Sequence, residues 1–140
     1  MIIVDTNVLS ELMRPKPSPR LIEWVAKQPA TELFTTSITE AEIFYGIELL
    51  PKSKRREGLL AAAEAMFAED FAGRIFGFDS DAARVFSKIA AHRRALGSPI
   101  SHADAQIAAI AQMRGAKLAT RNIADFENCH LDVVGPWRGS

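Results

Sequence analysis

Three acidic residues stand where a folded chain could gather them. Asp5 ends the apolar, β-branched run Ile2-Ile3-Val4, and Glu42 and Asp104 open later helical patterns. Such a run predicts a buried parallel strand, and an acid at its tip lies at the mouth of an open α/β sheet, where these folds bind ligands. Carboxylates that meet there need a cation among them, and oxygen ligands alone favour Mg²⁺ or Mn²⁺. The chemistry predicted is metal-assisted hydrolysis of a phosphate ester.

Two of these acids also have a purely structural explanation. Glu42 lies three residues after Thr39, and Asp104 lies three residues after Ser101, which is the spacing of a capping box. An acid in a first helical turn can be present only to bond a backbone N–H and to offset the helix dipole. Asp5 has no such explanation, because it lies at a strand tip. The set of three acids therefore favours a site over three separate caps.

Further candidates follow the run Lys117–Ala119. Thr120 and Asn122 lie at the tip of that expected strand and could hold a metal-bound water, although a plain turn explains them as well. Arg121 lies between them and is a possible phosphate contact. Asp125 is a further candidate, although a cap of a short helical turn explains it as well. Asn7, two residues after Asp5, could orient Asp5 or cap the first helix.

Strands alternate with helical patterns along the chain. This alternation predicts an α/β fold with a central, mainly parallel sheet of four to five strands and helices on both faces, in a single domain over residues 1–140. Gly115 is a natural helix C-cap, and Ser18 before Pro19 is a good helix start. The expected strands are Ile2–Val4, Leu33–Thr35, Ile75–Phe78, Lys117–Ala119 and Asp132–Val134, and the helical faces run over residues 21–25, 43–50, 59–67, 82–90 and 103–111.

The composition limits the class of protein. The 140 residues are 48% apolar and 24% charged. The formal net charge is zero, which argues against a protein that binds nucleic acid through its overall charge. The one cysteine, Cys129, allows no internal disulfide and is expected to be structural. No run is apolar enough to cross a bilayer, and the first residues lack the pattern of a signal peptide. We expect a cytoplasmic protein with no membrane partner.

Taken in order, the motifs resemble a PIN domain, in particular the VapC/FitB class of toxins in bacterial toxin–antitoxin pairs. The resemblance covers essentially the whole chain. It is carried by residues 3–10 (IVDTNVLS), 37–42 (SITEAE) with Gly46, Ala103-Asp104 with residues 107–109, Thr120-Arg121-Asn122 with Phe126, and Pro136-Trp137.

The resemblance implies a PIN-like three-layer α/β/α fold and a Mg²⁺-dependent endoribonuclease, with Mn²⁺ able to substitute. The family's first three acids correspond to Asp5, Glu42 and Asp104, and Asn122 stands where the family often has a fourth acid. This exchange lowers the local negative charge and bears on whether a second metal binds. The resemblance further implies a homodimer, a silencing antitoxin and contact with DNA only through that antitoxin.

Two alternatives remain at this point. The first is a catalytically degenerate PIN domain that acts as an interaction partner in an antitoxin–DNA complex, which Asn122 encourages. The second is a haloacid-dehalogenase-like phosphatase with Asp5 as its nucleophile, although that motif requires a second Asp where Asn7 stands.

The remaining polar and aromatic features are expected to be structural. The basic run Lys52–Arg56 is typical of a solvated helix start, and His92-Arg93-Arg94 of a helix C-terminus, where cations suit the dipole. His102 could shuttle a proton but is expected to be an exposed first-turn residue. Trp24 and Trp137 could each serve a dimer contact or a partner groove.

Overall fold

The structure is a computed structural model, and it describes residues 1–138 of the chain. Its strands are β1 (Ile2–Val4), β2 (Leu33–Thr36), β3 (Ile75–Phe76), β4 (Lys117–Ala119) and β5 (Val133–Val134). Its α-helices are α1 (Thr6–Leu12), α2 (Pro19–Ala26), α3 (Ser37–Glu48), α4 (Lys54–Ala65), α5 (Ser80–Ala95) and α6 (His102–Arg114). Shorter helical turns are η1 (Ala30–Glu32), η2 (Met66–Asp70, a π-helix), η3 (Ile123–Phe126) and η4 (Pro136–Arg138).

In this part of the chain the strands form one parallel sheet in the order β3-β2-β1-β4-β5. The central strand β1 pairs on both sides, so that Ile3 lies opposite Phe34 of β2 and Leu118 of β4. The chain winds outward from β1 through β2 to β3 and then returns to β4 on the other side. The strand order therefore reverses between β1 and β4, and open α/β sheets bind ligands outside the carboxyl ends of the strands at such a point.

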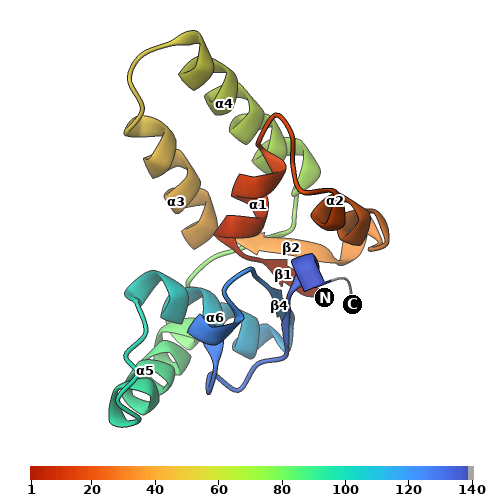
Figure 1. Cartoon of the computed structure of the whole chain (residues 1–140). Coiled ribbons are helices and arrows are strands. Elements are labelled where there is room, and N and C mark those ends of the chain that lie inside the picture. The colour runs from red at the N-terminus through yellow and green to blue at the C-terminus, as the bar shows by residue number, and fades with distance from the viewer. Residues whose placement is uncertain (139–140) are drawn as a thin grey trace.

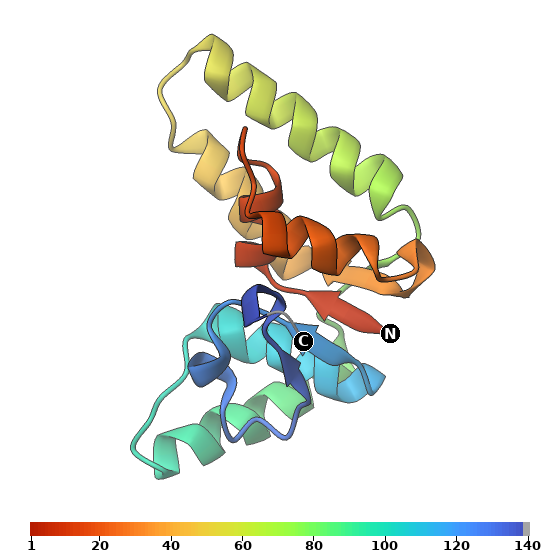
Figure 2. The same cartoon turned by 45° about the vertical axis from the view of Figure 1, so that its right-hand side comes forward.

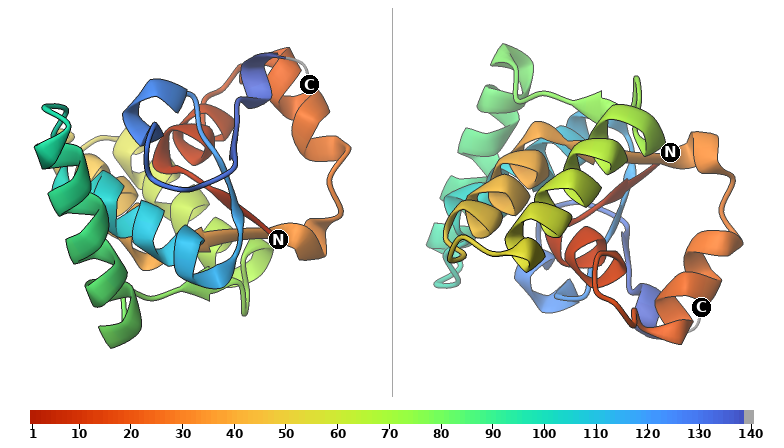
Figure 3. Two further views of the ribbon diagram at one scale, coloured as in Figure 1. Left: turned by 90° about the horizontal axis from the view of Figure 1, so that it is seen from below. Right: turned by 90° about the horizontal axis from the view of Figure 1, so that it is seen from above.

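Alternation along the strands builds a core on each face of the sheet. Ile3 packs with α5 and α6, and its neighbour Val4 packs with α1 and α2, because successive strand side chains point to opposite faces. Figures 1 and 2 show α5 and α6 below the sheet and α1 to α4 above it, and Figure 3 shows α5 and α6 lying side by side. These layers confirm the expected three-layer α/β/α fold.

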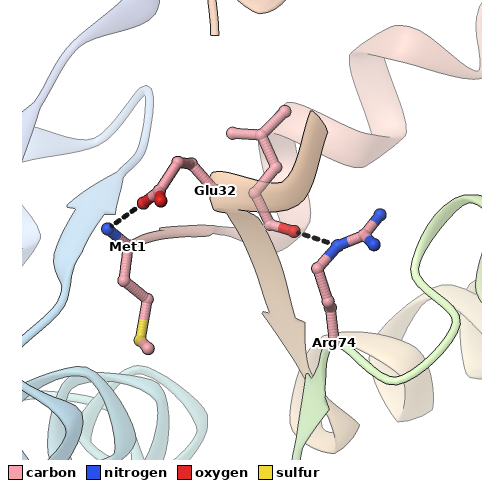
Figure 4. Close-up of polar contacts among 4 residues, drawn as sticks. Met1, Glu32 and Arg74 are labelled. Atoms are coloured by element: carbon pink, nitrogen blue, oxygen red, sulfur yellow. Dashed lines mark hydrogen bonds and ion pairs between the residues drawn. The ribbon is translucent and has the colours of Figure 1, made fainter. Parts of the chain in front are cut away.

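Polar contacts tie together the amino ends of the first three strands. The N-terminal amine of Met1 donates to Oε2 of Glu32 at 2.5 Å, and Nε of Arg74 donates to the carbonyl of Leu33 at 2.9 Å (Figure 4). The Arg74 guanidinium also donates to the carbonyl of Asp70. These contacts lie at the amino ends of the strands. A site would therefore lie at the opposite edge of the sheet, where the strands have their carboxyl ends.

The structure confirms β1, β4 and the Gly115 cap and corrects several other boundaries. β3 stops at Phe76 rather than Phe78, and α3 begins at Ser37, well before the apolar face that predicted it. Ser18 precedes α2 as expected but makes no side-chain cap. Within residues 1–138, none of the helices combines the length and apolarity needed to cross a bilayer.

The Gly115 cap can be tested by substitution. Gly115 adopts φ 63° at the end of α6 and has no heavy atom near its Cβ position, so Gly115→Ala adds backbone strain without a clash. We expect a loss of about 1 kcal/mol in the free energy of unfolding. Gly58→Ala in exposed α4 is the matched control, and it should stabilise by about 0.5–1 kcal/mol. Urea denaturation measures both, and equal effects would contradict the cap.

Candidate active site

Asp5 occupies the junction between β1 and α1. Its carboxylate is 4% exposed, and Oδ1 accepts a hydrogen bond from the backbone N–H of Thr6 at 2.8 Å, which makes Asp5 the N-cap of α1. The other oxygen, Oδ2, accepts from the hydroxyl of Thr120 at 2.7 Å and from Nδ2 of Asn7 at 3.1 Å. Asp5 therefore caps a helix, which was not expected from the sequence, and is held by donors from α1 and from the residue that follows β4.

Asn7 joins the tips of the two central strands. Its Nδ2 lies 3.2 Å from Oγ1 of Thr120, and its Oδ1 accepts from the backbone N–H of Arg121 at 3.0 Å. The Thr120 hydroxyl also accepts from the backbone N–H of Asn122 at 3.2 Å. Of the two roles expected for Asn7, the contacts support orientation of Asp5, because Asp5 itself caps α1.

Glu42 is not part of a capping box. The N-cap of α3 is Thr36, whose Oγ1 accepts from the N–H of Thr39, so the helix begins earlier and Glu42 lies beyond its first turn. Thr36 takes the cap because it is the buried last residue of β2, and the chain turns from it directly into α3. Oε1 of Glu42 instead accepts from the hydroxyl of Thr6 on α1 at 2.6 Å. The structural explanation for Glu42 is therefore wrong, and its side chain turns toward the end of β1.

Asp104 lies in the first turn of α6, where its backbone N–H takes part in the helix cap, and its role as a metal ligand stays a prediction. Ser101 is the N-cap of α6, and its Oγ accepts from the backbone N–H of Asp104 at 3.2 Å. The Ser101 hydroxyl also acts on the Asp104 carboxylate, where it lowers the pKa against the effect of burial. The side chain is half-buried. It lines the same cavity as Asp5 and Glu42, with a volume of about 360 Å³. Three elements, β1, α3 and α6, thus deliver one carboxylate each to the edge where β1 and β4 diverge.

Mutual repulsion among these acids is built into the cavity. The pKa of Asp5 is raised from its usual 3.8 to about 6, mainly by burial, with a smaller increase from the negative charges of Asp104 and Glu42 and against the hydrogen bonds from Thr120 and Thr6. Burial likewise raises the pKa of Asp104, with added repulsion from Asp125 and Glu42. A cation in the cavity would relieve both effects.

The donor set fits a hydrated divalent ion rather than a closed metal cage. Within residues 1–138, no three His, Cys, Asp or Glu side chains are drawn together into a ready-made ligand cluster. The three acids share a cavity instead. Mg²⁺ keeps several waters and binds through one or two carboxylates together with substrate phosphates, so a shared cavity is compatible with it.

The other expected site residues lie in different parts of the site and its surroundings. Asn122 and Arg121 line the cavity with the acids, whereas Thr120 lies beneath them as a fully buried donor to Asp5. Asp125 falls inside η3 and is exposed. His102 is exposed at the start of α6, with its ring against the edge of Phe86. The catalytic roles of these residues stay predictions.

Sequence reasoning missed Glu11, a fourth acid in the cavity wall. Glu11 is 8% exposed, accepts from the backbone N–H of Ser18 at 2.9 Å and pairs with Arg14 at 3.6 Å. It lies four residues after Asn7 on α1, so the two share a helix face. That spacing was the signal available in the sequence.

Arg93 is the second missed residue. It lies in the last turn of α5 as expected, but its guanidinium is buried at 4% exposure instead of facing solvent. It donates to the carbonyl of Ser98 at 2.8 Å and to that of Asp125 at 2.7 Å. Its positive charge also acts to lower the pKa of Asp104. Arg93 therefore joins the segment before α6 to η3, behind the cavity.

The structure also locates the basic run, the cysteine and the two tryptophans. The run Lys52–Arg56 is mostly exposed and begins α4, as expected, and Cys129 is buried. Trp24 is 6% exposed in the core, so the expectation of a contact surface there is wrong. Trp137 is half-buried on η4.

Comparison with known proteins supplies independent information on the fold and its relatives. The PIN domain family model matches residues 2–128. The plasmid stability protein StbB of Pseudomonas syringae is 38% identical over 137 residues, which cover 98% of this chain and 99% of that protein. The VapC ribonuclease Y4jK of Sinorhizobium fredii is 36% identical, with 98% of each chain covered.

Solved structures agree with these relatives. The crystal structure of FitAcB from Neisseria gonorrhoeae matches with a TM-score of 0.91 at 34% identity and covers 98% of this chain and 99% of that one. The structure of FitAB bound to an IR36 DNA fragment matches equally well, with 98% and 96% covered. These matches agree with the resemblance stated above and not with a phosphatase.

The buried charge of Asp5 predicts an unusual response to its removal. In metal-free protein at pH 7.5, Asp5→Asn should raise the free energy of unfolding by about 1–3 kcal/mol, because a desolvated, repelled charge disappears while an oxygen remains to cap α1. Added MgCl₂ or MnCl₂ should raise the Tm of the wild type and not of the variant. Thermal denaturation with and without metal measures both. Exposed Asp132→Asn is the control and should change neither.

The same charge predicts a pH dependence with a definite sign. Folded Asp5 takes up a proton near pH 6, whereas the unfolded residue stays ionised to about pH 4, so between these values the folded state binds more protons. Metal-free wild type should therefore gain stability relative to Asp5→Asn as the pH falls from 7.5 to 5. A difference between the two proteins that does not vary with pH would contradict the raised pKa.

Proposed function

This chain belongs to the PIN domain family, and from that premise we propose that it is the toxin of a toxin–antitoxin pair, an endoribonuclease that hydrolyses RNA phosphodiester bonds. The observation that carries the proposal is the shared cavity of Asp5, Glu42 and Asp104 at the switch point of the sheet. Repulsion among the three carboxylates destabilises the protein, and the same repulsion favours the binding of a cation that can in turn bind phosphate.

The proposed cofactor is Mg²⁺, for which Mn²⁺ can substitute. Asp5, Glu42 and Asp104 would hold the ion, because all their donors are carboxylate oxygens. When bound, the ion would activate a water nucleophile and neutralise charge on the phosphodiester. Asn122, in the cavity wall, would contribute an amide where an acid would add charge.

The chain's own side chains have separable roles in this proposal. The Thr120 hydroxyl and the Asn7 amide orient Oδ2 of Asp5 and would fix the rotamer of this carboxylate for the ion. The Thr6 hydroxyl does the same for Glu42. Arg121, the cation beside Asn122, is proposed to contact a phosphate of the RNA.

Partners follow from the named relatives. A relative 34% identical to this chain is named as the toxin FitB, and the FitAB structure is bound to a DNA fragment, so we propose a cognate antitoxin as the protein partner and DNA contact only through it. Homodimer formation and a cytoplasmic location complete the proposal.

Cleavage of labelled RNA tests the enzymatic proposal. Glu42→Gln and Asp104→Asn should each lower the rate of Mg²⁺-dependent cleavage by about 10²-fold or more, since each removes a charged ligand. Glu40→Gln is the matched control, because Glu40 lies on the same helix but does not line the cavity, and it should cleave like the wild type.

A chelator should abolish cleavage, and added Mg²⁺ should restore it. Cleavage that survives the chelator, or variants at Glu42 and Asp104 that match Glu40→Gln, would sink the proposed site. No cleavage by the wild type of any RNA offered, even with Mg²⁺ present, would instead favour a degenerate PIN domain.

A further inference from the structure

Arg121 is a cation in the acidic cavity that is held by a ring rather than by a carboxylate. Its Cζ lies 4.9 Å from the ring centroid of Trp137, within the range of about 6 Å for a cation–π contact. Arg14, the other arginine that lines the cavity, pairs with Glu11. Among residues 1–138, no ion pair or side-chain hydrogen bond includes the Arg121 guanidinium, so its N–H donors stay available for an anion.

The Trp137 ring is held in place by packing and not by a hydrogen bond from its indole N–H. Within the described chain, the indole Nε1 of Trp137 is buried without a hydrogen-bond partner, which costs free energy. The ring packs against the core cluster above the sheet, and the Trp137 carbonyl accepts from Nη1 of Arg20 on α2 at 3.1 Å. A segment distant in sequence from α2 is thus fixed with its ring beside the cavity.

We propose that Trp137 is a positioning residue, which holds the Arg121 guanidinium where it binds a phosphate of the RNA strand next to the scissile bond. The proposal rests on the proposed ribonuclease function. A long arginine side chain loses rotamer freedom when it binds, and contact with an aromatic face removes part of that freedom in advance. The backbone bond from Arg121 to Asn7 fixes the base of the same side chain. Arg121 thereby presents paired N–H donors to the paired oxygens of a phosphate.

A double-mutant cycle separates this role from simple packing. Trp137→Leu should raise the KM for an RNA oligonucleotide about 2- to 5-fold, the size of an exposed cation–π contact, with a smaller change in kcat. Arg121→Met should raise KM about 10-fold or more, because it removes charge-assisted hydrogen bonds. In the Arg121→Met background, Trp137→Leu should have no further effect on KM.

Two further variants serve as controls. Trp137→Phe keeps a ring and removes the orphan N–H, so it should fold at least as stably as the wild type with a KM between those of wild type and Trp137→Leu. Lys88→Met removes one exposed cation from α5, away from the cavity, and should leave KM unchanged. Equal effects of Trp137→Leu in both backgrounds, or a lowered Tm with an unchanged KM, would overturn the proposal.

A binding measurement keeps this inference separate from the proposed function. In a Trp24→Phe protein, Trp137 is the remaining tryptophan, and its fluorescence should change when an RNA oligonucleotide is added in the presence of a chelator. The change should be lost in Trp24→Phe/Arg121→Met. A signal that is absent, or that survives the loss of Arg121, would overturn the role of Trp137 even if the wild type cleaves RNA.

Discussion

Burying the carboxylate of Asp5 at the tip of the central strand is the constraint on which the rest of this structure depends. The side chain is 4% exposed, and burial raises its pKa to about 6 even though it accepts three hydrogen bonds. Two of the donors, Thr6 and Asn7, lie on α1, and the third, Thr120, directly follows β4. The pairing of β1 with β4 therefore determines both the fold at the switch point and the orientation of this acid.

The other two acids make the ionised form of Asp5 less favourable still. Glu42 and Asp104 arrive from α3 and α6, and both raise the pKa of Asp5 by repulsion. The cations nearby are placed apart from direct pairing with these carboxylates: Arg93 is engaged by backbone carbonyls behind the cavity, and Arg121 lies over Trp137. Because these arginines do not neutralise the carboxylates, the site is suited to bind a metal cation, as a metal-dependent nuclease requires.

The elements that local pattern determines were predictable from the sequence. β1 and β4 are short apolar runs with polar residues at their carboxyl ends, and Gly115 is needed for its left-handed φ. The start of α3 was not predictable in this way, because Thr36 and Thr39 are both good caps and only the length of β2 decides between them.

Tertiary contacts decide the rest. The burial of Arg93 depends on carbonyls that lie 5 to 34 residues away in sequence, and the placing of Glu11 depends on the chain returning at Ser18. No local pattern marks such charges as interior. The candidate site was predictable as a set of acids at strand and helix ends, whereas their shared cavity and the network of threonines required the folded chain.

The most direct measurement is a crystal structure of the protein soaked in Mn²⁺, with anomalous scattering used to locate the ions. The account predicts at least one ion in the cavity, with oxygens of Asp5 and of Glu42 or Asp104 among its ligands. A fully soaked crystal in which Mn²⁺ binds elsewhere, while the cavity holds no ion and the carboxylates keep only their protein contacts, would contradict it.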